Sequence, residues 1–299
     1  MRDYYKKRRS PLWRYAAMAA LALVAIVAAW QLIGYGVQMF SSRSLQQELE
    51  QELVAEQAGE PTATPVPQLS DGPTQQPSPT PMSVNARVYA TFDGKPEIRL
   101  ALSSLWERNP DLVGWVTVEA LPRLNLPIVQ RDHVYYLRRD FDGRVNSNGT
   151  AFMDVTCSIW PRSDNLIVYA HNMKSGEMFG GLQKLLHENN WRNLPMSTFS
   201  TLYEKADYVP VAAFLCDLGR GPRHFNFTQT DFRDEAEFNE FIAKAQSLSE
   251  VHPPYDVRYG DKLLTLVTCH GDTDTQRLVV ILRQMRADEN REELEKMWR

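Results

Sequence analysis

A long run without charge near the N-terminus constrains this chain more than any other feature. From Tyr15 to Ser42 the sequence contains no Asp, Glu, Lys or Arg, and Ala16 to Ala29 consists of Ala, Leu, Val, Ile and Met. A helix that crosses a bilayer needs about 20 predominantly apolar residues, and Tyr15 to Phe40 provides them. The sequence therefore predicts one transmembrane anchor at residues 15–40.

The residues before this run predict its orientation. Residues 1–14 form a basic head that contains Arg2, Lys6, Lys7, Arg8, Arg9 and Arg14. Because positively charged flanks stay in the cytoplasm, we expect a single-pass protein with a cytoplasmic N-terminus and an exported remainder. A cleaved signal peptide is the alternative, although its apolar core spans only about 7–15 residues and Gly34-Tyr35-Gly36 is a poor cleavage site.

Two segments of different composition follow the anchor. Residues 41–59 carry Leu45, Leu49 and Leu53 on one helical face among many Glu and Gln, which predicts a solvated juxtamembrane helix. Residues 60–83 are rich in Pro, Thr, Ser and Gln, which is typical of an extended stalk that buries no core. A docking site for a proline-binding module is the alternative. We expect one globular domain at residues 84–299.

The globular part contains many short strand-like runs and few helical ones. One clear helix, at about residues 232–248, carries Phe238, Phe241, Ile242 and Ala245 as an apolar stripe. Residues 287–299 resemble a charged surface helix. Many short strands separated by turns indicate a barrel or a sandwich. The strand-like runs are 113–118, 126–130, 150–153, 166–170, 198–203, 208–215, 263–268 and 278–282.

Charge and cysteine content exclude several classes of function. The formal net charge of −4 gives no reason to expect nucleic acid as a partner. The three cysteines, Cys157, Cys216 and Cys269, are an odd number without a CxxC pair, so a disulfide framework or a zinc knuckle is not expected. The acidic clusters match no metal-binding loop, and we expect neither metal nor cofactor. Cys157 and Cys216 lie on or beside strands and suit packed positions.

The third cysteine stands at the end of a strand, beside an arginine. The run from Asp261 to Cys269 has the content of a buried strand, and a second strand-like run opens on Arg277. A short polar loop joins them, so a hairpin-like return would hold Cys269 and Arg277 at one rim of a sheet. Because a nearby cation lowers the pKa of a thiol, this placement favours a nucleophilic thiolate.

A cysteine nucleophile also needs a histidine close to it in space. His171 follows the apolar run 166–170 directly, which is the same kind of strand-end position that Cys269 occupies. His270 adjoins Cys269 in sequence, but successive side chains of a strand point to opposite faces. We therefore expect His171, Cys269 and Arg277 to form the site. The other histidines, in polar surroundings, are His133, His187, His224 and His252.

These segments resemble the sortases, and several further runs resemble class B in particular. Tyr169 to Met173 and Met178 to Leu182 are similar to the histidine segment of that family. Thr265-Leu-Val-Thr-Cys269 is similar to its TLxTC segment, and the run that starts at Arg277 is similar to its arginine strand. The resemblance covers about residues 84–285. The class B runs are 114–118, 126–130, 135–143, 149–154 and the long helix before the cysteine strand.

The resemblance implies a mainly β fold and a transpeptidase. The fold is an eight-stranded closed barrel with an N-terminal helical part and a long helix before the cysteine strand. By resemblance, Cys269 attacks the carbonyl of a threonine in a C-terminal sorting signal of another exported protein. His171 protonates the departing amine and accepts a proton from the incoming one. Arg277 holds the substrate backbone and stabilises the oxyanion, and Thr268 contributes to the substrate groove.

Several alternatives stay open at this stage. The acceptor implied by the resemblance is a peptidoglycan amine in the wall of a Gram-positive type of cell, and a lysine of a pilin subunit is the alternative. Asp272 is a further candidate to orient a catalytic group. Two other classes are a catalytically silent, membrane-tethered binding module and a cysteine transpeptidase that acts on peptidoglycan stems. The His-Gly-Cys neighbourhood typical of the last class is absent from this sequence.

Overall fold

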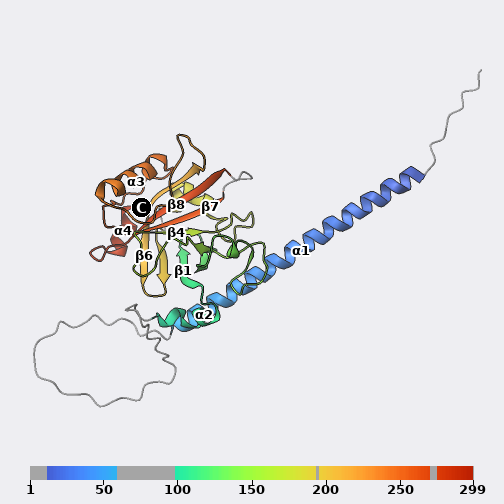
Figure 1. The fold of residues 1–299 in the computed structure, drawn as a ribbon, viewed down its shortest axis with the longest axis horizontal. Coiled ribbons are helices and arrows are strands. Elements are labelled where there is room, and N and C mark those ends of the chain that lie inside the picture. Colours follow the sequence, from blue (N-terminus) through green and yellow to red (C-terminus); the bar gives the residue numbers. More distant parts are fainter. Residues whose placement is uncertain (1–11, 59–97, 193–194, 270–274, 299) are drawn as a thin grey trace, which may run out of the picture. The chain divides into compact units, whose positions relative to one another are not determined.

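The computed structural model of the protein describes residues 12–58, 98–192, 195–269 and 275–298 (Figure 1). The chain divides into two compact units, residues 1–45 and residues 46–299, which are described in turn. The predicted stalk at residues 60–83 lies outside the described residues, as does most of the basic head.

The first unit contains the larger part of the helix α1 (Leu12–Gln57). This helix is long and apolar enough to cross a membrane, and its most apolar window is entirely exposed. Trp30, for example, keeps 78% of its surface accessible. A helix with apolar side chains on every face is suited to surroundings of lipid rather than water. The predicted transmembrane anchor therefore corresponds to a helix of the required length and composition.

The second unit is built on a closed barrel of eight strands, as the family resemblance implied (Figure 1). Neighbouring strands follow the order β1-β2-β3-β4-β7-β8-β6-β5 around the barrel. Most pairs are antiparallel, but β2 with β3 and β4 with β7 are parallel. The strands are β1 (Leu112–Val118), β2 (Asn125–Val129), β3 (Phe152–Met153), β4 (Asn165–Tyr169), β5 (Ser197–Thr201), β6 (Lys205–Asp217), β7 (Leu263–Cys269) and β8 (Gln276–Gln284).

The central strands are apolar on both faces because helices and loops cover the outside of the barrel. Leu166, Ile167 and Val168 of β4 are all fully buried. Thr265 of β7 is equally buried, and its hydroxyl donates to Asn165 Oδ1 at 2.8 Å. A buried hydroxyl needs such a partner, because an unsatisfied one would cost the free energy of its desolvation. The β4–β7 pair is therefore fixed by side chains as well as by its backbone ladder.

The long helix before the cysteine strand is α3 (Glu235–Leu248), and it packs against β6 (Figure 1). It starts later than the predicted residue 232 because the Asp234 carboxylate caps it, accepting from Glu237 N at 2.9 Å. Phe232 lies outside the helix but still packs on the Phe238 ring, at 5.0 Å between centroids. Shorter helices are η1 (Leu100–Leu102), α2 (Ser103–Arg108), η2 (Tyr135–Arg138), η3 (Leu182–Leu186), η4 (Glu188–Asn190) and α4 (Arg291–Met297).

The last turns of α1 belong to the second unit and are not a solvated helix. Leu49 and Leu53 are 1% and 6% exposed, which corrects the expectation drawn from their polar neighbours. Glu56 Oε1 accepts from Ser104 N at 3.0 Å, within the first turn of α2. Because the α2 N-cap residue Leu102 provides no side-chain hydrogen bond, this carboxylate satisfies a backbone donor that the helix itself leaves unpaired. Residues 46–57 therefore form part of the globular domain.

This docking predicts a measurable contribution to stability. Leu49→Ala should lower the free energy of unfolding by about 2–4 kcal/mol, because it removes a buried side chain and leaves a cavity. Val54→Ala is the matched control, since Val54 lies on the same helix and is 63% exposed. Guanidinium unfolding of the full chain in detergent measures both changes. Equal stability of the two variants would contradict the docking.

Candidate active site

Strand register brings the three predicted site residues to one end of the barrel. β4 and β7 are parallel, and their last paired residues are Tyr169 and Val267. His171 follows Tyr169 at the same offset as Cys269 follows Val267, so both lie two residues past that last pair, at the same end of β4 and β7. On the other side, Cys269 of β7 is the direct antiparallel partner of Arg277 in β8. The backbones of all three residues therefore meet at one rim.

A cavity of about 380 Å3 opens at this rim. His171, Thr268 and Arg277 line it, together with apolar and aromatic side chains that include Phe152, Leu218 and Phe227. The side chain of Cys269 and the whole of His270 and Asp272 lie outside the described residues. Among the described lining residues, Arg277 carries the one permanent positive charge and Asp154 the one negative charge. The cavity is thus mostly apolar, with a cation opposite the cysteine backbone.

His171 is held by a backbone carbonyl from a distant segment. Its Nε2 lies 2.7 Å from the carbonyl oxygen of Leu137, in η2. A carbonyl only accepts hydrogen bonds, so this contact assigns the ring hydrogen to Nε2 when the imidazole is neutral. Nδ1 is then the nitrogen without a hydrogen, which is the one suited to take up and release a proton. The Leu137 contact therefore fixes both the orientation and the tautomer of the ring.

Thr268 connects the cysteine strand to the histidine segment. Its side chain is 2% exposed, and Oγ1 donates to the carbonyl oxygen of Ala170 at 2.6 Å. Ala170 is also bonded through its backbone, since its N donates to Val267 O at 3.3 Å. These contacts hold the residues before Cys269 against the residue before His171. Thr268 lines the cavity, and its hydroxyl links the cysteine strand to the histidine segment.

Arg277 lies in the middle of three strands. It pairs with Cys269 on β7 and with Cys216 on β6. Its side chain is half-buried, and Nη1 donates to the backbone oxygen of Gln276 at 2.9 Å. A guanidinium held beside a small apolar cavity acts more strongly on a developing negative charge than it would in water. The site is thus suited to chemistry that passes through an oxyanion.

Sequence reasoning missed an acid that shapes the wall of the cavity. Asp154 Oδ2 accepts from the Tyr169 hydroxyl at 2.8 Å and lies 3.4 Å from His133 Nε2. Burial alone would raise the pKa of Asp154, but hydrogen bonds from Thr156 and Tyr169 outweigh it and lower the pKa below its usual value. Burial, followed by the Asp154 charge, raises the pKa of Tyr169.

Both Asp154 and Tyr169 lie in runs that carry the family resemblance, which was the available signal. Their contact joins β4 to the segment after β3, and no local pattern predicts that the two residues pair. Among the described residues, no three His, Cys, Asp or Glu side chains gather closely enough to hold a metal ion.

The other two cysteines are buried in the barrel, as their strand positions suggested. Cys157 is 5% exposed, and its Sγ accepts from Ile167 N at 3.2 Å. Cys216 is fully buried. Burial raises the pKa of Cys157 to about 12 and that of Cys216 to about 11. Both thiols therefore stay protonated and shielded at neutral pH.

This contrast predicts selective labelling of one thiol. A methanethiosulfonate reagent at pH 7.5 should modify Cys269 in the folded chain and leave Cys157 and Cys216 unmodified, because thiolates react and buried thiols do not. Peptide mass spectrometry locates the adduct. In guanidinium all three should react, which controls for the reagent. Modification of Cys157 or Cys216 at the rate of Cys269 would contradict the assignment.

The chain is similar in sequence and structure to several known proteins. No protein-family model matches the chain. Over 196 residues, or 65% of this chain and 77% of the relative, it is 26% identical to the protein called Sortase B from Listeria monocytogenes. The solved structure of sortase B from Bacillus anthracis in complex with AAEK1 is 30% identical, with a TM-score of 0.56, over 63% of this chain and 86% of that one.

Two structures from Staphylococcus aureus agree with this fold. The sortase B–substrate complex is 25% identical, with a TM-score of 0.58, and the match covers 64% of this chain and 87% of that one. A further structure, of Sortase B alone, reaches a TM-score of 0.62 over 83% of this chain and 98% of that one. At 22% identity this last likeness supports the fold alone.

Proposed function

Because the chain belongs to the class B sortases, which are cysteine transpeptidases, we propose that it cleaves a C-terminal sorting signal after Thr and transfers the released protein to a peptidoglycan amine. Membership of this family replaces the hypothesis of a silent binding module. The strand register is the single observation that supports the proposal best: Cys269 pairs directly with Arg277, and β7 runs parallel to β4, which ends two residues before His171.

In the first half of the proposed reaction, the Cys269 thiolate attacks the carbonyl carbon of the threonine. Directly opposite residues of an antiparallel pair present their side chains to the same face, so we expect the thiol beside Arg277. The guanidinium stabilises the oxyanion of the tetrahedral intermediate. His171 Nδ1 takes the thiol proton when the thiolate forms, and it gives this proton to the leaving amine as the C–N bond breaks, so that a thioester with Cys269 remains.

In the second half, an amine of the acceptor attacks the thioester carbonyl. The new C–N bond forms, the C–S bond breaks, and His171 Nδ1 takes the proton that the amine loses. The thiolate of Cys269 is restored, so the chain is ready for another donor. The thioester conserves the free energy of the cleaved peptide bond, which is why transfer needs no external energy source.

The chain is a candidate membrane-anchored surface enzyme, and we propose its orientation from charge. The basic residues 1–14 stay in the cytoplasm and residues 15–40 cross the membrane. Residues 41–59 and 84–299 lie outside the cell, where sorting signals and the wall are accessible. The fully exposed apolar window of α1 supports the anchor. A pilin lysine as acceptor would use the same donor reaction.

The thiol carries the chemistry in this proposal. Cys269→Ala should reduce cleavage of a library-selected sorting peptide at least about 1,000-fold, because a covalent route is lost. Cys216→Ala removes a buried thiol and is the matched control, with cleavage expected to stay near the wild-type rate. Peptide cleavage by the full chain in detergent is followed by mass spectrometry. Undiminished cleavage by Cys269→Ala would refute the proposal.

Thr268 should act through positioning. Thr268→Val removes the hydrogen bond to Ala170 O at similar volume and should lower kcat about tenfold, since it releases the strand beside His171. Thr268→Ser retains the hydroxyl and should recover most of the rate, which a purely steric role would not allow. Steady-state kinetics on the same peptide separate kcat from KM. Equal kcat for the Val and Ser variants would contradict a positioning role.

A further inference from the structure

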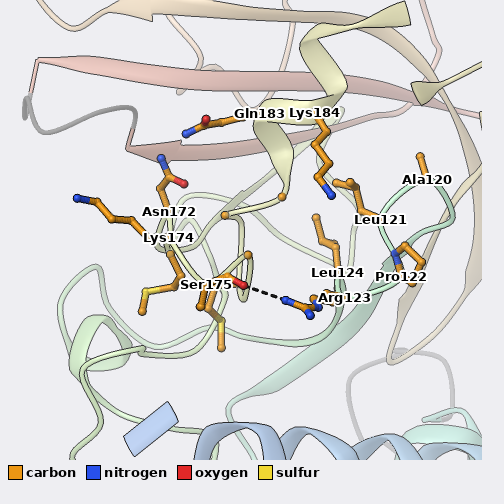
Figure 2. Close-up of a pocket in the computed structure, with 15 residues that line it drawn as sticks. Ala120, Leu121, Pro122, Arg123, Leu124, Asn172, Lys174, Ser175, Gln183 and Lys184 are labelled. Carbon is orange, nitrogen blue, oxygen red and sulfur yellow. Dashed lines mark hydrogen bonds between the residues drawn. The ribbon is translucent and has the colours of Figure 1, made fainter. Parts of the chain in front are cut away.

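A second, larger cavity begins at the residue next to His171. It has a volume of about 890 Å3 and lies between the loop at residues 119–124, which joins β1 to β2, and residues 172–184 after β4 (Figure 2). His171 lines the smaller cavity and Asn172 lines the larger one. Neither the donor reaction nor the three site residues use this larger cavity. We call it the basic groove, for the side chains described next.

Three cations line the basic groove: Arg123, Lys174 and Lys184. Figure 2 shows Arg123 entering from the β1–β2 loop and Lys184 from η3. Among the described lining residues there is no carboxylate. Glu177, outside the lining, is 3.8 Å from Arg123 Nη1 and offsets part of that charge. On a chain of net charge −4, cations gathered in one hollow create a local positive potential.

The wall of the basic groove is fixed to His171 by backbone hydrogen bonds. Phe179 N donates to His171 O at 3.0 Å, and Gly176 N donates to Met173 O at 2.9 Å. Arg123 Nη1 donates to Ser175 O at 2.9 Å, which ties the two loops together. A Cβ at Gly180 would collide with the carbonyl oxygen of Met173, so only glycine permits this close approach. The groove wall is thus held in a set position against the His171 backbone.

We propose that the basic groove binds the acceptor, and that it selects a peptide carrying carboxylates close to its nucleophilic amine. This inference rests on the proposed function, because the second half-reaction needs an amine to reach the thioester next to His171. A volume of this size accommodates several peptide residues. The carboxylates pair with Arg123 and Lys184, while the amine continues past Asn172 to the imidazole.

The same cations act against acceptors that carry only a positive charge. An amine must be neutral to attack, and positive charges nearby lower its pKa because they disfavour the ammonium form. The groove therefore repels a bare ammonium and retains an amine whose own molecule supplies the compensating negative charges. An uncharged or cationic acceptor, such as a lysine surrounded by neutral residues, gains nothing from the groove.

The test compares two acceptors that differ in charge alone. Gly-Glu-Glu carries three carboxylates, and Gly-Gln-Gln-amide carries none. With a library-selected donor and the full chain in detergent, the KM for Gly-Glu-Glu should be about tenfold lower than that for the amide. The double variant Arg123→Gln with Lys184→Gln should remove this difference by raising the KM for Gly-Glu-Glu about tenfold. The KM for the amide and the rate of donor hydrolysis should stay within about twofold.

Arg233→Gln is the matched control. Arg233 is an exposed arginine paired with one glutamate, Glu237 at 3.0 Å, as Arg123 is paired with Glu177. It lies before α3, away from the groove lining, and its variant should leave both KM values unchanged. N-acetylated Gly-Glu-Glu, which has no amine, should compete with Gly-Glu-Glu without slowing hydrolysis. Competition by inorganic phosphate as strong as by this peptide would overturn selection of carboxylates.

Two kinds of failure are distinguishable. Equal KM values for the two acceptors in the wild type, or an unchanged preference in the double variant, would overturn the basic groove while donor hydrolysis continued. Donor hydrolysis that continued in Cys269→Ala would instead overturn the proposed function itself. We expect each variant to fold, since both substituted side chains are exposed. Thermal unfolding of each variant checks this.

Discussion

The pairing of β7 with two different neighbours is the constraint on which the site depends. Its parallel register with β4 sets the level of His171, and its antiparallel register with β8 sets the level of Arg277. A slip of one residue in either ladder would turn the alternate side chains of the moved strand to the other face. The buried bonds from Thr265 to Asn165 and from Thr268 to Ala170 cross the β4–β7 ladder and hold its register.

The charged side chains around this rim differ between the small cavity at Arg277 and the basic groove. Arg277 faces a small and mostly apolar cavity, where the interaction between charges is strong. Asp154, which would oppose an oxyanion, is occupied by hydrogen bonds from Tyr169 and Thr156. The exposed cations Arg123 and Lys184 lie instead in the basic groove, where solvent screens them. There they act on the affinity for the acceptor more than on the activation barrier.

Much of this arrangement follows from sequence, and the remainder depends on tertiary contacts. The apolar run at 166–170 and the run ending at Cys269 predicted strands, and residues at their ends therefore predicted a shared rim. The same patterns do not predict which element packs against each apolar face. Leu49 and Leu53 form an apolar stripe, but the stripe does not show that the helix packs on the globular domain. Phe232 continues the apolar stripe of α3, although the helix begins only after the Asp234 cap. The Asp154–Tyr169 and Arg123–Ser175 bonds join distant segments, which no local pattern reveals.

In the proposed reaction, a sulfur, an imidazole and a guanidinium converge on one carbonyl. A crystal structure of the enzyme carrying a non-hydrolysable sorting-peptide mimic linked to Cys269 tests it most directly. We expect the mimic's carbonyl oxygen within hydrogen-bond distance of Arg277, roughly 2.6–3.2 Å. We expect Nδ1 of His171 to point at the linkage while Nε2 keeps its bond to Leu137. A mimic whose carbonyl lies away from both side chains, at the other end of the barrel or in bulk solvent, would contradict it.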